Sequence, residues 1–152
     1  MVPPSRCASA SGHRLSSASE RERALQRWYR EQLKALVPGI VEKWQTKLGA
    51  ELDEWRIRRM KTKWGACSAG ARRIWLNSEL AKKPVRCIEY LVLHELVHLI
   101  ERRHNERFVS ILDEHLPGWR LRRDELNAAP LAHERWECWG ANLRYPTTNA
   151  IP

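Results

Sequence analysis

Residues 90–98, with the sequence YLVLHELVH, form an apolar segment that carries two histidines four positions apart. In an α-helix, residues i and i+4 lie one above the other on the same face, so His94 and His98 can bind one metal ion from a single turn. Glu95 lies about 100° further round the helix, beside that metal and off the line that joins its ligands. A carboxylate in this position suits a general base that takes a proton from a metal-bound water. The segment therefore predicts a helix that carries a metal site.

A third protein ligand is needed, because a catalytic zinc site has three protein ligands and a water. His104 follows His98 by six residues, and an unbroken helix would carry it to a different face. We therefore expect the helix to run to about Glu101 and the chain to turn back directly after it. Asn105 can then cap a new helix that runs to about Leu116.

Other interpretations of these residues stay open. The five-residue H-E-x-x-H pattern also occurs by chance on amphipathic helices, although two unliganded histidines in so apolar a helix would be hard to satisfy. Glu114 or Glu125, on later helices, could replace His104 as the third ligand. His133 and Cys138 belong to no paired ligand motif, and we expect no metal site there.

Length and composition predict one folded domain, residues 19–127, between a disordered tail at 1–18 and an irregular tail at 128–152. Hydrophobic residues make up 43% of the 152 residues, and eight residues are tryptophans, which is enough for one core. The four cysteines show neither C-x-x-C spacing nor a disulfide pattern. No signal peptide or membrane-spanning segment is recognisable, so a cytoplasmic protein with reduced thiols is expected.

The net charge of +9 favours an acidic partner, and nucleic acid is the usual one. The cations are, however, scattered over several short groups, and no nucleic-acid-binding motif accompanies them. We therefore favour a solvated basic surface, with nucleic acid as a possible but less favoured partner.

Hydrophobic periodicity predicts the remaining elements. A capping box at Ser19–Glu22 opens a helix that breaks or kinks at Pro38 and continues to Gly49. Two strands, 55–64 and 72–77, are joined as a hairpin by a loop at 65–71. A last short helix covers 119–127. The apolar stripe expected on the first helix comprises Leu25, Trp28, Tyr29, Leu33, Leu36, Ile40, Val41, Trp44 and Leu48.

Three further motifs accompany H-E-L-V-H: M-K-T-K-W-G-A-C-S at 60–68, I-W-L-N at 74–77 and H-L-P-G-W at 115–119. In this order and spacing they resemble the YgjP-like metallopeptidase family, which is related to the SprT-like zinc proteases. The resemblance covers about 28–126. It implies an α+β, zincin-like fold with a small antiparallel sheet or hairpin packed on the helix that carries the motif, and with flanking helices.

The same resemblance implies one zinc ion per chain, bound by His94, His98 and His104, with Glu95 as the catalytic acid-base. Two features depart from the family pattern. The β-rich stretch that usually precedes the first helix has no counterpart in 1–18, so we expect part of the sheet to be missing. The family's W-G-S-C reads W-G-A-C here, with Ala66 as a small change.

Trp64 and Cys67 are expected to brace the hairpin against the helix rather than to take part in chemistry. Cys67 is not needed as a nucleophile, because a metal-bound water already fills that role.

The favoured function is zinc-dependent hydrolysis of peptide bonds in a polypeptide substrate. One alternative is a zinc-dependent hydrolase of nucleotide phosphoric anhydrides, although the sequence has no Gly-rich phosphate loop. A second alternative is a nucleic-acid-associated module with structural zinc. Glu95 argues against it, because a closed structural site does not need a base.

Overall fold

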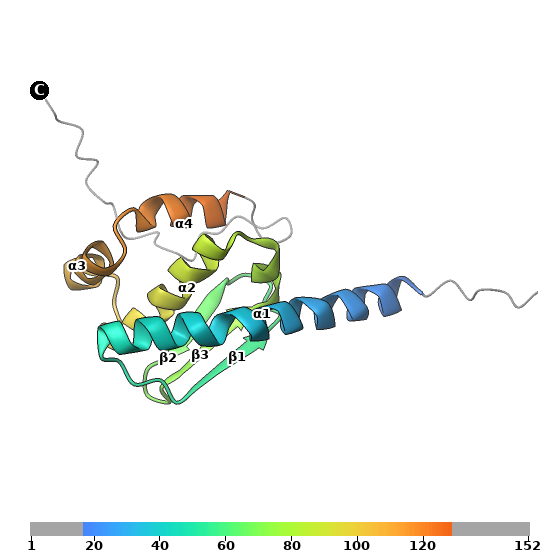
Figure 1. The fold of residues 1–152 in the computed structure, drawn as a ribbon, viewed down its shortest axis with the longest axis horizontal. Coiled ribbons are helices and arrows are strands. Elements are labelled where there is room, and N and C mark those ends of the chain that lie inside the picture. Colours follow the sequence, from blue (N-terminus) through green and yellow to red (C-terminus); the bar gives the residue numbers. More distant parts are fainter. Residues whose placement is uncertain (1–16, 129–152) are drawn as a thin grey trace, which may run out of the picture.

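The structure of the chain is a computed structural model that describes residues 17–128. Four α-helices, three strands and one 3-10 helix follow one another along these residues (Figure 1). In chain order they are α1 (Ala18–Leu48), β1 (Glu54–Arg58), β2 (Gly65–Ser68), β3 (Arg73–Asn77), η1 (Ser78–Lys82), α2 (Val85–Val97), α3 (Glu106–His115) and α4 (Trp119–Asn127). The predicted tails lie outside the described residues, apart from Ser17 and Ala18, which begin α1, and Ala128, which ends α4.

Helix α1 begins two residues earlier than predicted. The Ser17 hydroxyl accepts a hydrogen bond from the Glu20 amide at 3.2 Å, and the Glu20 carboxylate accepts one from the Ser17 amide at 2.8 Å. This is a capping box, in which two unpaired amides at the helix start are satisfied reciprocally. The S-x-x-E pattern occurs at both 17–20 and 19–22, and the structure uses the first of them.

Of the break or kink predicted at Pro38, the break is wrong, because α1 runs without interruption to Leu48. Pro38 is itself exposed, whereas Val37 and Val41 on either side of it are buried in the core. Packing of this face therefore outweighs the hydrogen bond that a proline removes from a helix. Gly49, with φ 62°, ends α1 as predicted.

The apolar stripe of α1 is correct over its C-terminal part and wrong at its start. Tyr29, Leu33 and Trp44 are buried as expected, but Leu25 is 41% exposed and Trp28 is 55% exposed. Figure 1 shows the reason: the first turns of α1 extend beyond the other elements. Periodicity identifies the face of a helix, but not how far its neighbours reach along it.

The sheet is mixed, with strand order β1-β3-β2. β1 lies parallel to β3, and β2 lies antiparallel to β3. The predicted hairpin between 55–64 and 72–77 is therefore wrong: its first strand ends at Arg58, and its presumed loop contains β2. The real hairpin turn is Ala69–Arg72, where the Arg72 amide donates to the Ala69 carbonyl at 3.3 Å. The α+β class is confirmed, while the sheet is not purely antiparallel.

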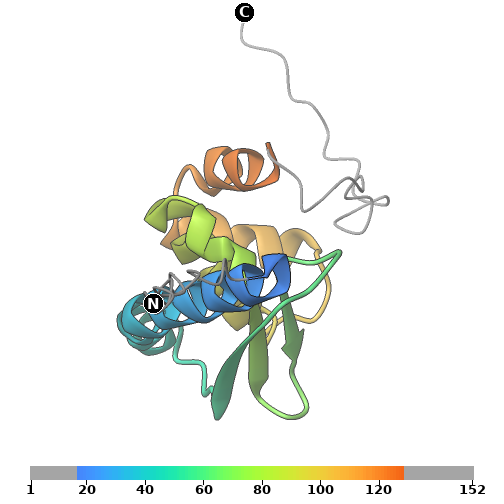
Figure 2. The same cartoon turned by 90° about the vertical axis from the view of Figure 1, so that its right-hand side faces the viewer.

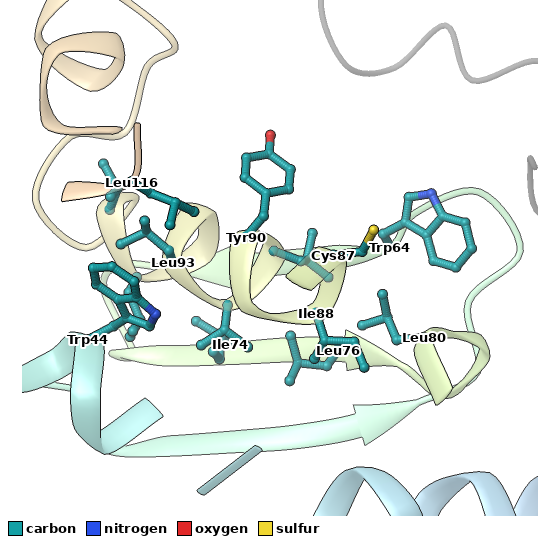
Figure 3. Packing of buried hydrophobic residues seen from close by; sticks show 14 of the residues in the cluster. Trp44, Trp64, Ile74, Leu76, Leu80, Cys87, Ile88, Tyr90, Leu93 and Leu116 are labelled. Carbon is teal, nitrogen blue, oxygen red and sulfur yellow. The ribbon is translucent and has the colours of Figure 1, made fainter. Parts of the chain in front are cut away.

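Helix α2 is buried almost all round, because it packs against the sheet on one side and against α1, α3 and α4 on others (Figure 2). Ile74 and Leu76 of β3 and Ile88 of α2 lie between the sheet and the helix (Figure 3). This explains why 87–97 is so apolar, and it places the two histidines of α2 at the end of a rigid, fully packed element. No helix among the described residues is long and apolar enough to cross a membrane.

Candidate metal centre

The C-terminal end of α2 places the first two histidines. The helix ends at Val97, four residues before the predicted end, and His98 is its C-cap. The turn that follows brings the chain back toward the helix. Asn105 then caps α3 as predicted, because its side-chain oxygen accepts a hydrogen bond from the Phe108 amide at 3.0 Å. This cap fixes the backbone directly after His104.

The three predicted histidines come together. The Nε2 atom of His104 lies 3.1 Å from Nε2 of His94 and 2.9 Å from Nε2 of His98. Nitrogen ligands about 2.0–2.1 Å from a tetrahedral zinc ion lie roughly 3.3 Å from one another. The separations are therefore close to those of a zinc site with three imidazoles. Among the described residues, this is the group of histidine, cysteine and acidic side chains that could hold a metal ion.

Two of the imidazoles are oriented through their other ring nitrogen. Nδ1 of His94 lies 3.2 Å from the Tyr90 hydroxyl, and Nδ1 of His98 lies 3.1 Å from the Glu101 carbonyl oxygen. If the Nε2 atoms bound a metal, each Nδ1–H would donate to its oxygen, and this hydrogen bond would fix the tautomer that metal binding requires. The Tyr90 ring stacks on Trp119, with centroids 6.0 Å apart and planes 10° apart, so the tyrosine is itself held in place.

Burial keeps the three imidazoles neutral. It lowers the pKa of His98 to about 4 and holds the pKa of His94 well below its usual value, with a further contribution from the neighbouring histidines. Burial also lowers the pKa of His104. A neutral imidazole is the form that binds a metal. The site is therefore ready for a cation without first losing protons near neutral pH.

Glu95 is buried on α2, and its Oε1 atom has no hydrogen-bond partner among the described residues. Burial raises the pKa of this carboxyl to about 8, and the positive charge of Lys63 opposes that rise. Gly65 of β2 lies directly against it: a Cβ atom there would be 2.7 Å from Oε1. A buried carboxyl oxygen without a hydrogen-bond partner is costly. The Oε1 atom is therefore suited to accept a hydrogen bond from a water molecule or a proton from a reacting group.

A cleft of about 580 Å³ lies beside these residues. One wall is β2 and the turn after it, and the other is formed by Glu95, His98, His104 and Arg102. Lys63, just before β2, also lines it. A volume of this size lies within the usual range of ligand-binding clefts.

Trp64 is buried in the core, as the predicted bracing role requires, whereas Cys67 lines the cleft. Burial, and secondarily the charge of Glu95, raises the pKa of the Cys67 thiol to about 12. A thiol with this pKa is protonated at neutral pH and is a poor nucleophile. This agrees with the expectation that Cys67 is not the attacking group.

The alternative third ligands lie elsewhere. Glu125 of α4 pairs with Arg86, whose Nε lies 2.6 Å from the carboxylate, and Glu114 is an exposed residue of α3. Neither belongs to the histidine cluster. His133 and Cys138 lie outside the described residues.

Sequence analysis did not single out Tyr90, Gly65, Lys63 or Arg102 as site residues. Tyr90 had a usable signal, because it precedes His94 by one helical turn and so lies on the same face. The contact of Gly65 with Glu95 had none, since it depends on how β2 packs against α2.

Comparisons with known proteins bear on the family and the fold of the chain. The sequence model of the YgjP-like metallopeptidase domain matches residues 7–129. No curated protein matches significantly. The fold is similar to the crystal structure of the metallopeptidase zymogen abylysin of Pyrococcus abyssi, with a TM-score of 0.56 and 23% identity over 60% of this chain and 92% of that chain. The metallopeptidase zymogen jannalysin of Methanocaldococcus jannaschii gives a TM-score of 0.52 and 23% identity over the same shares. These likenesses confirm the zincin-like fold.

Proposed function

The chain belongs to the YgjP-like metallopeptidase family, and from this membership we propose that it is a zinc-dependent peptidase with one zinc ion per chain. The proposed metal ligands are His94, His98 and His104. The observation that carries the proposal is the position of the His104 Nε2 atom, 3.1 Å from Nε2 of His94 and 2.9 Å from Nε2 of His98. This cluster lies next to the buried Glu95 carboxyl, whose Oε1 atom has no hydrogen-bond partner among the described residues. Family membership implies a divalent metal, and the all-imidazole ligand set favours zinc among such metals.

Glu95 is the proposed general base. When bound, zinc supplies Lewis-acid activation of water and of the peptide carbonyl. Because the positive charge of a bound cation would favour the ionised form of Glu95 over the protonated one, its carboxylate would accept the proton of the attacking water as the new carbon–oxygen bond forms. The same carboxyl group then gives this proton to the amine that leaves. Tyr90 and the Glu101 carbonyl hold two of the imidazoles in a fixed orientation throughout.

Strand β2 supports a polypeptide as substrate. In the order β1-β3-β2 it pairs only with β3 among the described strands, so its other edge has no strand beside it, and its residues line the cleft. Such an edge offers backbone donors and acceptors to an extended peptide. A hydrolase of nucleotide phosphoric anhydrides would need a site that cradles phosphates, and the described cleft has no loop of that kind before a helix N-terminus.

The test compares the wild type with Glu95→Gln. Glutamine keeps the shape of glutamate but cannot take up the proton. We expect zinc near one per chain in both proteins, and hydrolysis of an unfolded polypeptide that is lower in the variant by roughly 10²–10⁴-fold. The wild-type activity should disappear with a zinc chelator and return with added zinc.

Two results would contradict the proposal. A Glu95→Gln protein that is fully active at equal zinc content would exclude Glu95 as the base. Rapid hydrolysis of nucleoside triphosphates without peptide cleavage, measured in parallel, would favour the phosphoric anhydride alternative.

A further inference from the structure

Two cations line the cleft beside the histidine cluster. Lys63 lies two residues before β2, and Arg102 lies on the turn after α2. Glu95 is the single carboxylate that lines the cleft within the part of the chain that the structure describes. Because the three imidazoles are neutral, the fixed charges of the cleft wall are dominated by these two side chains and become more positive when a metal cation is bound.

Neither cation is neutralised by an ion pair within residues 17–128. The side chains of Lys63 and Arg102 are exposed, and neither forms an ion pair with a described carboxylate. Nearby arginines differ from them: Arg59 pairs with Glu22 at 3.1 Å, and Arg107 lies 4.0 Å from Glu101. The two cations of the cleft are therefore available to a ligand.

The two cations lie near different points of the cleft wall. Lys63 is the charge that acts on Glu95, which contacts Gly65 at the start of β2. Arg102 acts on Cys67, two residues further along the same strand. An extended peptide alongside β2 would therefore pass both cations of the cleft wall.

We propose that the cleft selects acidic polypeptide segments, with Lys63 and Arg102 each pairing with an Asp or Glu side chain near the scissile bond. This inference names the substrate class of the peptidase proposed above and rests on that function. It follows from two exposed cations that form no ion pair with a described carboxylate, on a cleft where Glu95 is the one carboxylate among the described lining residues. Charge complementarity of this kind favours the matching ligand and disfavours one with like charge.

Peptide binding to the zinc-loaded Glu95→Gln protein tests the inference. This variant does not cleave the peptide, and substitution of Lys63 or Arg102 in it cannot act through the ionisation of Glu95. Three fluorescent peptides of about ten residues differ only in two residues that flank the central bond, which are both Glu, both Gln or both Lys. Fluorescence anisotropy gives each dissociation constant at low and high salt. We expect the Glu peptide to bind roughly 5–25-fold more tightly than the Lys peptide, on the scale of two exposed ion pairs, and the difference to shrink in high salt.

Matched variants in the same background identify the residues. Lys63→Glu with Arg102→Glu should reverse the preference, and Lys63→Gln with Arg102→Gln should remove it. Arg27→Glu with Arg30→Glu changes the net charge by the same amount on exposed residues of α1 that do not line the cleft, and should keep the preference. Thermal unfolding of each variant confirms that it is folded before binding is measured.

Equal binding of the three peptides, or an acidic preference that survives the double charge reversal, would overturn the inference. Cleavage of the Gln peptide by the wild type reports on the proposed function separately. If that peptide is cleaved while binding shows no acidic preference, the peptidase stands and the specificity fails. If none of the peptides is cleaved while the preference and its reversal are observed, the cleft is an acidic-peptide site and the peptidase proposal fails.

Discussion

At the scale of single residues, the contact between Gly65 and Glu95 couples the sheet to the proposed base. A methyl group at position 65 would lie 2.7 Å from Oε1 and 3.0 Å from Cγ of Glu95, which is too close for any side chain to accept unchanged. Both residues are buried, so the carboxylate has little room to move away. The glycine is thus required by a close approach rather than by a turn.

Gly65→Ala is therefore expected to displace the Glu95 carboxylate while leaving the histidines in place. Hydrolysis should fall by about 10²-fold, the effect of a displacement near 1 Å, and overpacking should cost about 1–3 kcal/mol of stability. Zinc content should stay near the wild-type value. The measurements are peptide hydrolysis, metal analysis and urea unfolding. A Gly65→Ala protein with wild-type activity would show that the position of Glu95 is not critical.

At the scale of elements, two glycines of α1 and its C-cap have opposite effects on stability. Gly39, inside the helix, lowers the stability of the protein, and Gly49, at the C-cap, raises it. Gly39 lies inside the helix, where an added Cβ would meet nothing within 4 Å, whereas Gly49 ends the helix with φ 62°. Glycine inside a helix is unfavourable because the unfolded chain is so flexible there, and left-handed backbone is unfavourable for any residue with a Cβ.

Gly39→Ala should stabilise the protein by about 0.5–1 kcal/mol, and Gly49→Ala should destabilise it by about 1–2 kcal/mol. Each variant adds one methyl group to the same helix, so the pair forms its own control. Urea unfolding of both measures the two changes. Neither residue lines the cleft, so hydrolysis should stay at the wild-type level in both. Destabilisation by Gly39→Ala would mean that α1 does not continue through Pro38 in solution.

The helices and strands also show which parts of the fold local sequence patterns can predict. The i, i+4 histidines, the Asn105 cap and the long periodic helices are local patterns, and the structure contains all of them. β2 is only four residues long, begins with Gly65 and is followed two residues later by Gly70, so it was interpreted as a loop. The parallel pairing of β1 with β3 joins residues 19 positions apart, as in Glu54 with Arg73, and no local pattern specifies it. The exposure of Trp28 likewise depends on where the neighbouring elements end.

The candidate site divides in the same way. The three histidines and Glu95 could be predicted because one helical turn and one short return place them. The contact of Gly65 with Glu95, and the two cations of the cleft, depend on how β2 and the turn after α2 pack together. Such features depend on tertiary packing, and no spacing of residues along the sequence predicts them.

At the scale of the whole molecule, the buried site makes stability depend on pH in two opposite ways when no metal is bound. Burial lowers the pKa of His98 from 6.5 to about 4 and also lowers the pKa values of His94 and His104. The unfolded chain then binds more protons than the folded chain between about pH 4 and 6.5. The histidines therefore make the free energy of unfolding rise with pH through this range.

Glu95 acts in the other direction. Its pKa is raised by burial from 4.5 to about 8, so the folded chain holds a proton that the unfolded chain has lost between these pH values. Its contribution to stability is present below pH 4.5 and is lost as the pH rises toward 8. The histidines of the unfolded chain are about half protonated at pH 6.5 and lose their remaining protons by about pH 8. Over this range the histidine contribution therefore still rises slightly while the Glu95 contribution falls.

Between pH 6.5 and pH 8 the metal-free wild type should therefore lose stability relative to Glu95→Gln, which keeps the histidine contribution but lacks that of Glu95. Both proteins should still lose stability between pH 6.5 and about pH 5, because both keep the three buried histidines. Urea midpoints in the presence of a chelator, at these three pH values, measure both effects. The variant isolates Glu95 from all other titrating groups, since every other side chain is the same. An equal change of stability above pH 6.5 in both proteins would show that the folded protein does not hold Glu95 in its protonated form.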